Sequence, residues 1–206
     1  MRHAIALAIA PMLAIGCADA SDASELPSVL PHVETLRPLI ACIAERVEQS
    51  DETEEWSGGA PRGPAQSSAT VAACQAESGV TIRQVSNREP TDFTDPEFAK
   101  QGVFFMALMT FGDHRDHLTV EEFDEAMAIA RCLQQEQIVK GQILRKSPGE
   151  AHEITMSAMD KCVPNHREYL RNPEDMSLLG RSGFLGNTIG RLNLRYVEAA
   201  SAGEGT

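Results

Sequence analysis

The segment Thr119–Cys162, TVEEFDEAMAIARCLQQEQIVKGQILRKSPGEAHEITMSAMDKC, decides the fold. Its first residues have the pattern of a capping box, in which the Thr119 hydroxyl accepts from the backbone N–H of Glu122 and the Glu122 carboxylate reaches back to the N–H of Thr119. This start predicts a helix that runs toward Lys146 unless Gly141 divides it. Residues spaced by three and four form its apolar face: Val120, Phe123, Met127, Ala130 and Leu133.

A second helix start follows directly. Ser147-Pro148-Gly149-Glu150 combines a serine N-cap, a proline at the first helical position and a glutamate at the third. The predicted helix then reaches Cys162, two residues before Pro164. A disulfide between Cys132 and Cys162 would join the two helices as an antiparallel pair, so the segment predicts a disulfide-stapled helical hairpin.

The cysteines predict a second hairpin of the same kind. Without Cys17, which belongs to the N-terminal leader described below, four cysteines remain, and an even count in an exported chain favours disulfides. Three pairings are open. We favour Cys42–Cys74 with Cys132–Cys162, because the two pairs have nearly equal separations and the sequence LIACI around Cys42 resembles IARCL around Cys132. No C-x-x-C pair is present, which favours structural bonds over a redox-active pair.

The first 20 residues predict export. A short basic start, an apolar run and small residues are typical of a secretory signal peptide, and the run is too short to span a membrane. Ala14-Ile15-Gly16-Cys17 resembles a bacterial lipobox. That resemblance implies a lipid-anchored mature chain beginning at Cys17, and Ala18 after it implies the outer membrane. Ala18-Asp19-Ala20 offers an ordinary cleavage site instead, which would give a free periplasmic or secreted form.

The remainder predicts a compact all-α bundle of about five to seven helices with two disulfide-stapled hairpins. We expect a tether over 21–30, one helical domain over 31–200 with a flexible loop at 50–66, and a disordered tail over 201–206. Further helices are predicted at about 31–49, at 68–77 and from Asp95 onward. The stretch 103–111 is apolar all round, which predicts the central buried helix.

Three shorter segments carry weaker signals. Alternation over 80–85 predicts either a short strand or a helix extension, and Asn172-Pro173 has the pattern of a helix start. The glycine-rich stretch 180–191 is predicted to be mobile and rich in turns, because it lacks the strand and helix that flank a phosphate-binding loop.

One cluster has the composition of a metal site. Asp113, His114, Asp116 and His117 lie within five residues, and imidazole and carboxylate groups bind zinc and other divalent ions. A bound ion with an open position would activate water for hydrolysis. The capping box at Thr119 leaves the same residues in a turn, so an exposed acidic loop is the alternative interpretation.

No catalytic motif stands out, and the net charge of −12 argues against nucleic acid and anionic lipid surfaces as partners. The preferred hypothesis is a non-catalytic binding or structural module of the bacterial envelope that contacts an envelope protein, without a cofactor. One alternative is a metal-dependent hydrolase built on the cluster between Asp113 and His117. The other is a bundle that holds an apolar ligand along the phenylalanines and methionines of 103–111.

Overall fold

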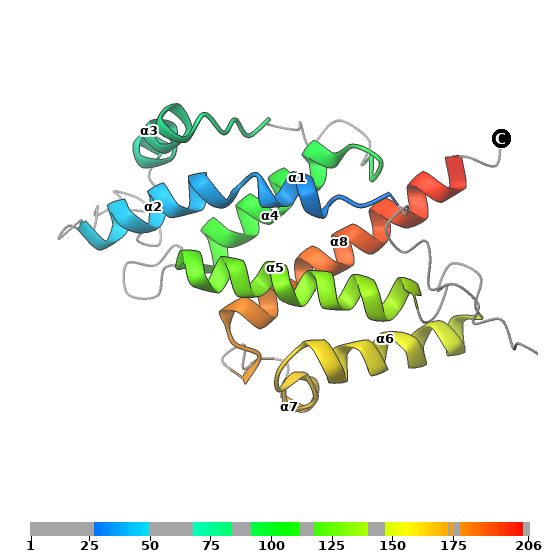
Figure 1. The fold of residues 1–206 in the computed structure, drawn as a ribbon. Helices are drawn as coiled ribbons and strands as arrows, with labels where there is room; N and C mark the ends of the chain where they lie inside the picture. Colours follow the sequence, from blue (N-terminus) through cyan, green and yellow to red (C-terminus); the bar gives the residue numbers. More distant parts are fainter. Residues whose placement is uncertain are drawn as a thin grey trace, which may run out of the picture.

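The computed structural model describes residues 27–49, 68–83, 92–111, 118–139, 147–172, 174 and 178–203. These ranges contain α-helices and one π-helical turn, without a strand, so the predicted compact all-α fold is confirmed (Figure 1). In chain order the elements are α1 (Leu30–Glu34), α2 (Arg37–Gln49), α3 (Ser68–Ser78), α4 (Pro96–Phe111), α5 (Val120–Gln134), η2 (Gln135–Val139), α6 (Pro148–Cys162), α7 (His166–Arg171) and α8 (Arg181–Gly203). Among the described helices, none is both long and apolar enough to cross a membrane.

The predicted helix starts are confirmed by their caps. Thr119 Oγ1 accepts from the N–H of Glu122 at 3.2 Å, and the N–H of Thr119 donates to Glu122 Oε2 at 3.0 Å. Ser147 and Glu150 form the same pair of bonds at the start of α6. These side chains satisfy backbone donors that have no partner inside the helix, which places each start where the sequence predicts it.

Both predicted disulfides are present. Cys42 is bonded to Cys74, which joins α2 to α3, and Cys132 is bonded to Cys162, which joins α5 to α6. The bonded residues are separated by 32 and 30 positions in the sequence. The two disulfide-stapled hairpins, α2–α3 and α5–α6, are therefore the main covalent constraints of the fold.

The centre of the bundle is α5 packed along α8, and here the sequence prediction is wrong. Residues 180–191 are predicted to be turn-rich, yet Arg181–Gly203 forms one helix of 23 residues beside α5 (Figure 1). A Cβ atom on Gly186 would lie 2.7 Å from Ile129 Cβ, and one on Gly190 would lie 2.7 Å from Leu133 Cδ1. Glycine at these positions lets the two backbones approach closely, so packing outweighs its low helix propensity.

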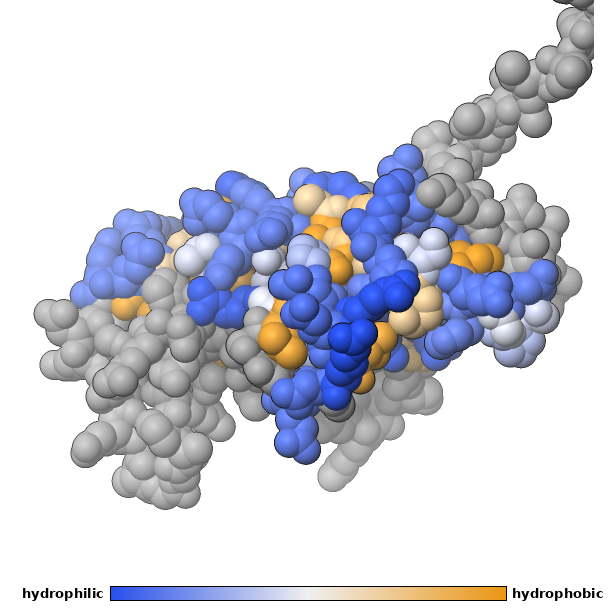
Figure 2. Space-filling view, turned by 90° about the horizontal axis from the view of Figure 1, so that it is seen from below, coloured by the Kyte–Doolittle hydropathy of each residue, from blue (hydrophilic) through white to orange (hydrophobic). Residues whose placement is uncertain are grey.

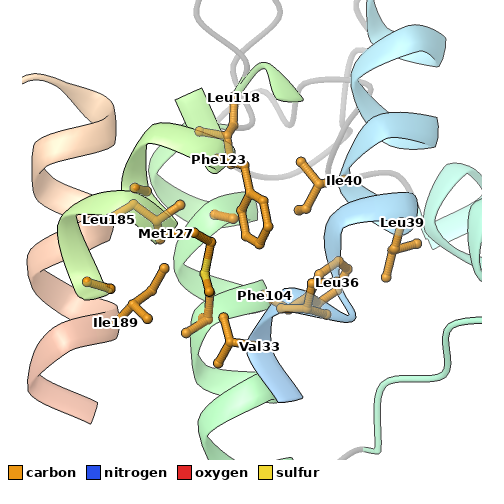
Figure 3. Close-up of a cluster of buried hydrophobic side chains, with 14 of the residues drawn as sticks. Val33, Leu36, Leu39, Ile40, Phe104, Leu118, Phe123, Met127, Leu185 and Ile189 are labelled. Carbon is orange, nitrogen blue, oxygen red and sulfur yellow. The ribbon is translucent and has the colours of Figure 1, made fainter. Parts of the chain in front are cut away.

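The main apolar core gathers around Phe123 and Met127 of α5. Leu36 from the α1–α2 junction and Leu185 from α8 meet them there, and all four side chains are buried (Figure 3). The helix predicted to be central, α4, packs on this core from one side. It is not buried all round, because Phe105 is 45 % exposed.

The folded part begins earlier than the predicted tether allows. Val29 and Leu30 are buried in the core, and the N–H of Val29 donates to Asn193 Oδ1 of α8 at 2.9 Å. The helix predicted over 31–49 is divided into α1 and α2. Pro38 lies in the first turn of α2, where a residue without an N–H is tolerated, so it marks a helix start and not a kink.

Other segments also differ from the predictions. The first helix of the central segment ends at Gln134 and continues as the π-turn η2, whose buried Glu136 pairs with Lys161 of α6. Residues 79–83 have no regular structure, although Val80 and Ile82 pack against the core. Asn172 closes α7 by donating its N–H to the Glu168 carbonyl, and so does not begin a helix.

Candidate functional site

The residues predicted for metal binding and lipidation lie outside the described ranges. This applies to Asp113, His114, Asp116 and His117, to Cys17, and to the predicted loop over 50–66. Within the residues that the structure describes, no group of three or more histidine, cysteine, aspartate or glutamate side chains is arranged to hold a metal ion. The metal hypothesis therefore stays a prediction from sequence.

His166 is the one buried histidine in the described part of the chain. Its Nε2 lies 3.5 Å from Asp160 Oδ1 and has no hydrogen-bond partner. Arg167 binds both carboxylate oxygens of Asp160, and this hydrogen bonding is the main reason that the pKa of Asp160 lies below its usual range. A general base must reach its substrate, and the His166 ring is only 3 % exposed. His166 therefore belongs to the packing between α6 and α7.

The most distinctive exposed feature is a row of phenylalanines on α4 and just before it, which we call the aromatic side of α4 and define as Phe93, Phe98 and Phe105. Phe98 and Phe105 are seven residues apart, which places them two turns apart on the same side of the helix. Phe93, just before the helix, stacks edge-to-face on Phe98 with ring centroids 5.7 Å apart. Phe93 is 38 % and Phe105 is 45 % exposed.

The rest of α4 explains why this side faces outward. Val103 and Ala107 are buried against the core on the opposite side of the helix. Gly102 lies close to Leu192 of α8, which a Cβ atom at this glycine would approach to 3.7 Å. With the core on one side and α8 on another, Phe105 remains in contact with solvent.

Carboxylates surround the N-terminal end of this row. Asp92 accepts hydrogen bonds from both the backbone N–H and the hydroxyl of Thr94, and the hydroxyl contributes most to lowering its pKa. Asp95 caps α4 by accepting from the N–H of Glu97 at 3.0 Å, and it also pairs with Arg83 at 3.2 Å. The exposed rings therefore lie beside two aspartate side chains, of which Asp95 is paired with Arg83.

The other described faces of the molecule expose fewer large apolar side chains. Figure 2 views the molecule from the side where α6 and α7 lie, and it shows a mainly hydrophilic surface with hydrophobic residues in small, separate groups. Leu170 of α7 is 55 % exposed but has no aromatic neighbour comparable to the Phe93–Phe98 pair among the described ring contacts. Isolated apolar side chains of this kind are common on protein surfaces.

The apolar-ligand hypothesis relied on the phenylalanines of 103–111. Phe104 is 3 % exposed and lies among Val33, Leu36 and the other core side chains (Figure 3). Its neighbour Phe105 points outward instead. The aromatic side of α4 could not be predicted from the sequence, because a segment that is apolar all round does not indicate which of its faces stays exposed.

No family model, curated protein or solved structure matches this chain. The proposed function is therefore based on the residues of this chain.

Proposed function

We propose that this chain is an exported, non-catalytic module that binds another envelope protein through the aromatic side of α4. The observation that carries this proposal is the exposure of Phe105 on α4 and of Phe93 just before α4, while Val103 and Ala107 on the opposite side of the helix are buried. Phenylalanine is enriched at protein interfaces, and burying such rings supplies much of the binding free energy.

Export is supported by two independent features. The first 20 residues have the pattern of a secretory signal peptide. Two disulfides join helices within the domain, and such bonds persist mainly in oxidising compartments. The resemblance of Ala14–Cys17 to a lipobox favours a chain held at the outer membrane through Cys17, with the module in the periplasm.

The charges around the ring row define the partner further. Asp92, Asp95 and Glu97 lie at or beside its N-terminal end, where Asp95 pairs with Arg83 and Glu97 with Lys100, and the whole chain has a net charge of −12. A partner surface that combines aliphatic side chains with lysine or arginine would complement it. Like-charged surfaces would be repelled, which disfavours a second copy of this acidic chain.

Site-specific photocrosslinking in cells that produce the protein tests the proposal. A photoreactive phenylalanine analogue at position 105 should give a discrete crosslinked product. The same analogue at Glu153, an exposed position on α6, should not. Adding Phe93→Ser should weaken the product at position 105, and raising the salt concentration before illumination should weaken it as well. Equal crosslinking at positions 105 and 153 would refute the assignment of this surface.

A further inference from the structure

A glycine interrupts the aromatic side of α4. Phe98, Gly102 and Phe105 are spaced by four and then three residues, so they share one stripe of the helix, with the glycine between the two rings. At a rise of about 1.5 Å per residue, the two phenylalanine positions are roughly 10 Å apart along the helix axis. Gly102 is itself partly exposed. The row therefore contains a position without a side chain between its two helical rings.

Packing within the described part of the chain does not require glycine at this position. A Cβ atom on Gly102 would have one described neighbour within 4 Å, Leu192 Cδ1 of α8, at the ordinary contact distance of 3.7 Å. Glycine in the middle of a helix is also less favourable than alanine, because more backbone freedom is lost when it folds. Alanine would therefore fit here and would favour the helix, so the described fold gives no reason for a glycine.

The glycines of α8 that face α5 have a different environment. Gly186 and Gly190 are buried, and aliphatic side chains of α5 already occupy the space next to them. Cβ atoms at these two glycines would lie 2.7 Å from Ile129 Cβ and from Leu133 Cδ1, respectively. The molecule thus packs branched aliphatic side chains of one helix onto glycines of another. Gly102 offers a similar arrangement on the exposed side of α4.

The surroundings of Gly102 are apolar. Figure 1 shows α8 beside α4, and from α8 the partly exposed Leu192 reaches the edge of the glycine position. Phe98 is partly exposed and Phe105 is exposed, and they lie on either side along the stripe. An aliphatic side chain placed on Gly102 would contact all three residues and remove apolar surface from water.

A carboxylate next to the row favours a basic group in the partner. Asp92 directly precedes Phe93, whose ring stacks on Phe98. The exposed Asp92 carboxylate accepts hydrogen bonds from Thr94, and no lysine or arginine among the described residues pairs with it. A lysine or arginine of the partner can therefore bind Asp92 without displacing an existing ion pair.

We propose that the aromatic side of α4 binds an amphipathic helix of the partner, which inserts one leucine or isoleucine between Phe98 and Phe105 onto Gly102. A lysine or arginine about two turns away on the same face of that helix contacts Asp92. A helix suits this surface because its side chains recur every three and four residues, the spacing of the two rings from the glycine. This inference rests on the proposed function and specifies the chemistry of the partner.

Photocrosslinking with substitutions at position 102 tests the inserted side chain. The photoreactive analogue stays at position 105, and the chain also carries either Gly102→Leu or the control Gly149→Leu. Gly149 is an exposed residue in the first turn of α6, where a Cβ atom would meet no described atom within 4 Å. Gly102→Leu should lower the yield of the crosslinked product at least about fivefold, because leucine fills the space that the partner side chain needs. Gly149→Leu should leave the yield unchanged.

The smaller substitution Gly102→Ala keeps the test decisive if melting curves show that Gly102→Leu does not fold. It adds one methyl group at an uncrowded position and should lower the yield at least about twofold. An unchanged yield with the folded Gly102 variants would overturn the insertion and leave the proposed binding surface intact. Absence of any product from position 105 in the parent chain would refute the proposed function as well.

Mass spectrometry of the crosslinked peptides identifies the occupant. Analogues at positions 98 and 105 should crosslink to residues about seven apart in one partner segment, because both rings lie along a single helix. A leucine or isoleucine should lie between those two residues, and a lysine or arginine should lie within about two turns of it. Crosslinks to a second copy of this chain, to lipid or to a segment without this spacing would overturn the inference.

Discussion

The hairpins α2–α3 and α5–α6 share one design and differ in what surrounds the bond. Their disulfides close loops of similar length, 32 and 30 residues. In α5–α6, helix α5 supplies Phe123 and Met127 to the core and α6 buries Ala158 beside the bond. In α2–α3, helix α2 supplies Leu39 and Val47 to the same core, whereas Cys74 is the one fully buried side chain among those that the structure describes in α3. Equal covalent constraints therefore have different structural roles when the packing around them differs.

The largest loss of stability is expected from a substitution that removes core packing in one hairpin. Phe123→Ala should lower the free energy of unfolding by about 3–5 kcal/mol, because the fully buried ring leaves a cavity at the centre of the core. Val71→Ala in α3 should cost less than about 1 kcal/mol, because this side chain is only partly buried. Urea unfolding followed by circular dichroism measures both. Similar losses for the two variants would contradict the contrast between the hairpins.

Removing each disulfide should have the next largest effect. The chain-entropy estimate is about 3.5 kcal/mol for either loop. The double variant Cys132→Ala, Cys162→Ala should lose most of this amount in a single global transition. The double variant Cys42→Ala, Cys74→Ala should lose less, because Cys74 is the one fully buried side chain among those described in α3, so the helix gains more freedom in the native state when the bond is absent. Calorimetric melting of the two variants side by side measures the difference, and a larger loss for the α2–α3 pair would reverse our assignment.

The close contact of α5 with α8 gives a third prediction. Gly186→Ala should destabilise the protein by about 1–3 kcal/mol, because the new Cβ would meet Ile129 Cβ at 2.7 Å and the Ala126 carbonyl oxygen at 2.8 Å. Gly102→Ala in α4 is the matched control, with its nearest neighbour at an ordinary 3.7 Å. It should be neutral or stabilise by up to about 1 kcal/mol through helix propensity. Chemical denaturation separates the two outcomes, and destabilisation by both variants would mean that tight packing is not specific to α8.

The ion pair between the two hairpins should have the smallest effect. Arg37 of α2 binds both carboxylate oxygens of Asp124 in α5 at 2.7 Å, and this hydrogen bonding is the main cause that lowers the pKa of Asp124. The contribution to stability is therefore present above the usual aspartate range and is lost as the pH falls through the lowered pKa. Asp124→Asn should lower the melting temperature at pH 7, and only slightly, because both side chains are about half exposed. At pH 2 the difference from the parent protein should disappear, because protonation of Asp124 removes the charge that the substitution removes. A deficit that persists at pH 2 would point to lost packing and not to lost charge.

Local signals in the sequence predicted much of the fold. The capping residues Thr119 and Ser147 mark helix starts because their side chains bond to nearby backbone groups, and such contacts depend on only a few neighbouring residues. The pairing of the four described cysteines followed from count and spacing. The metal cluster between Asp113 and His117 and the lipidation at Cys17 stay predictions, because those residues lie outside the described ranges.

Other features depend on contacts between residues far apart in the chain. Val29 joins the core through Asn193, which lies 164 positions away. The exposure of Phe105 beside the buried Phe104 follows from where the core and α8 lie around α4. A helical pattern identifies apolar residues, but it does not show which of them a neighbouring helix will cover.

By itself, then, the sequence determined the all-α class and the helix starts, because caps and periodicity act over short distances, and it indicated the two disulfide-stapled hairpins through the count and equal spacing of the cysteines. Only the tertiary structure decided that residues 181–190 belong to the helix α8 and that this helix lies at the centre. Gly183, Gly186 and Gly190 disfavour a helix when considered alone. Beside α5 the absence of their side chains permits close contact, and the packing gained along the two helices stabilises what local propensity opposes.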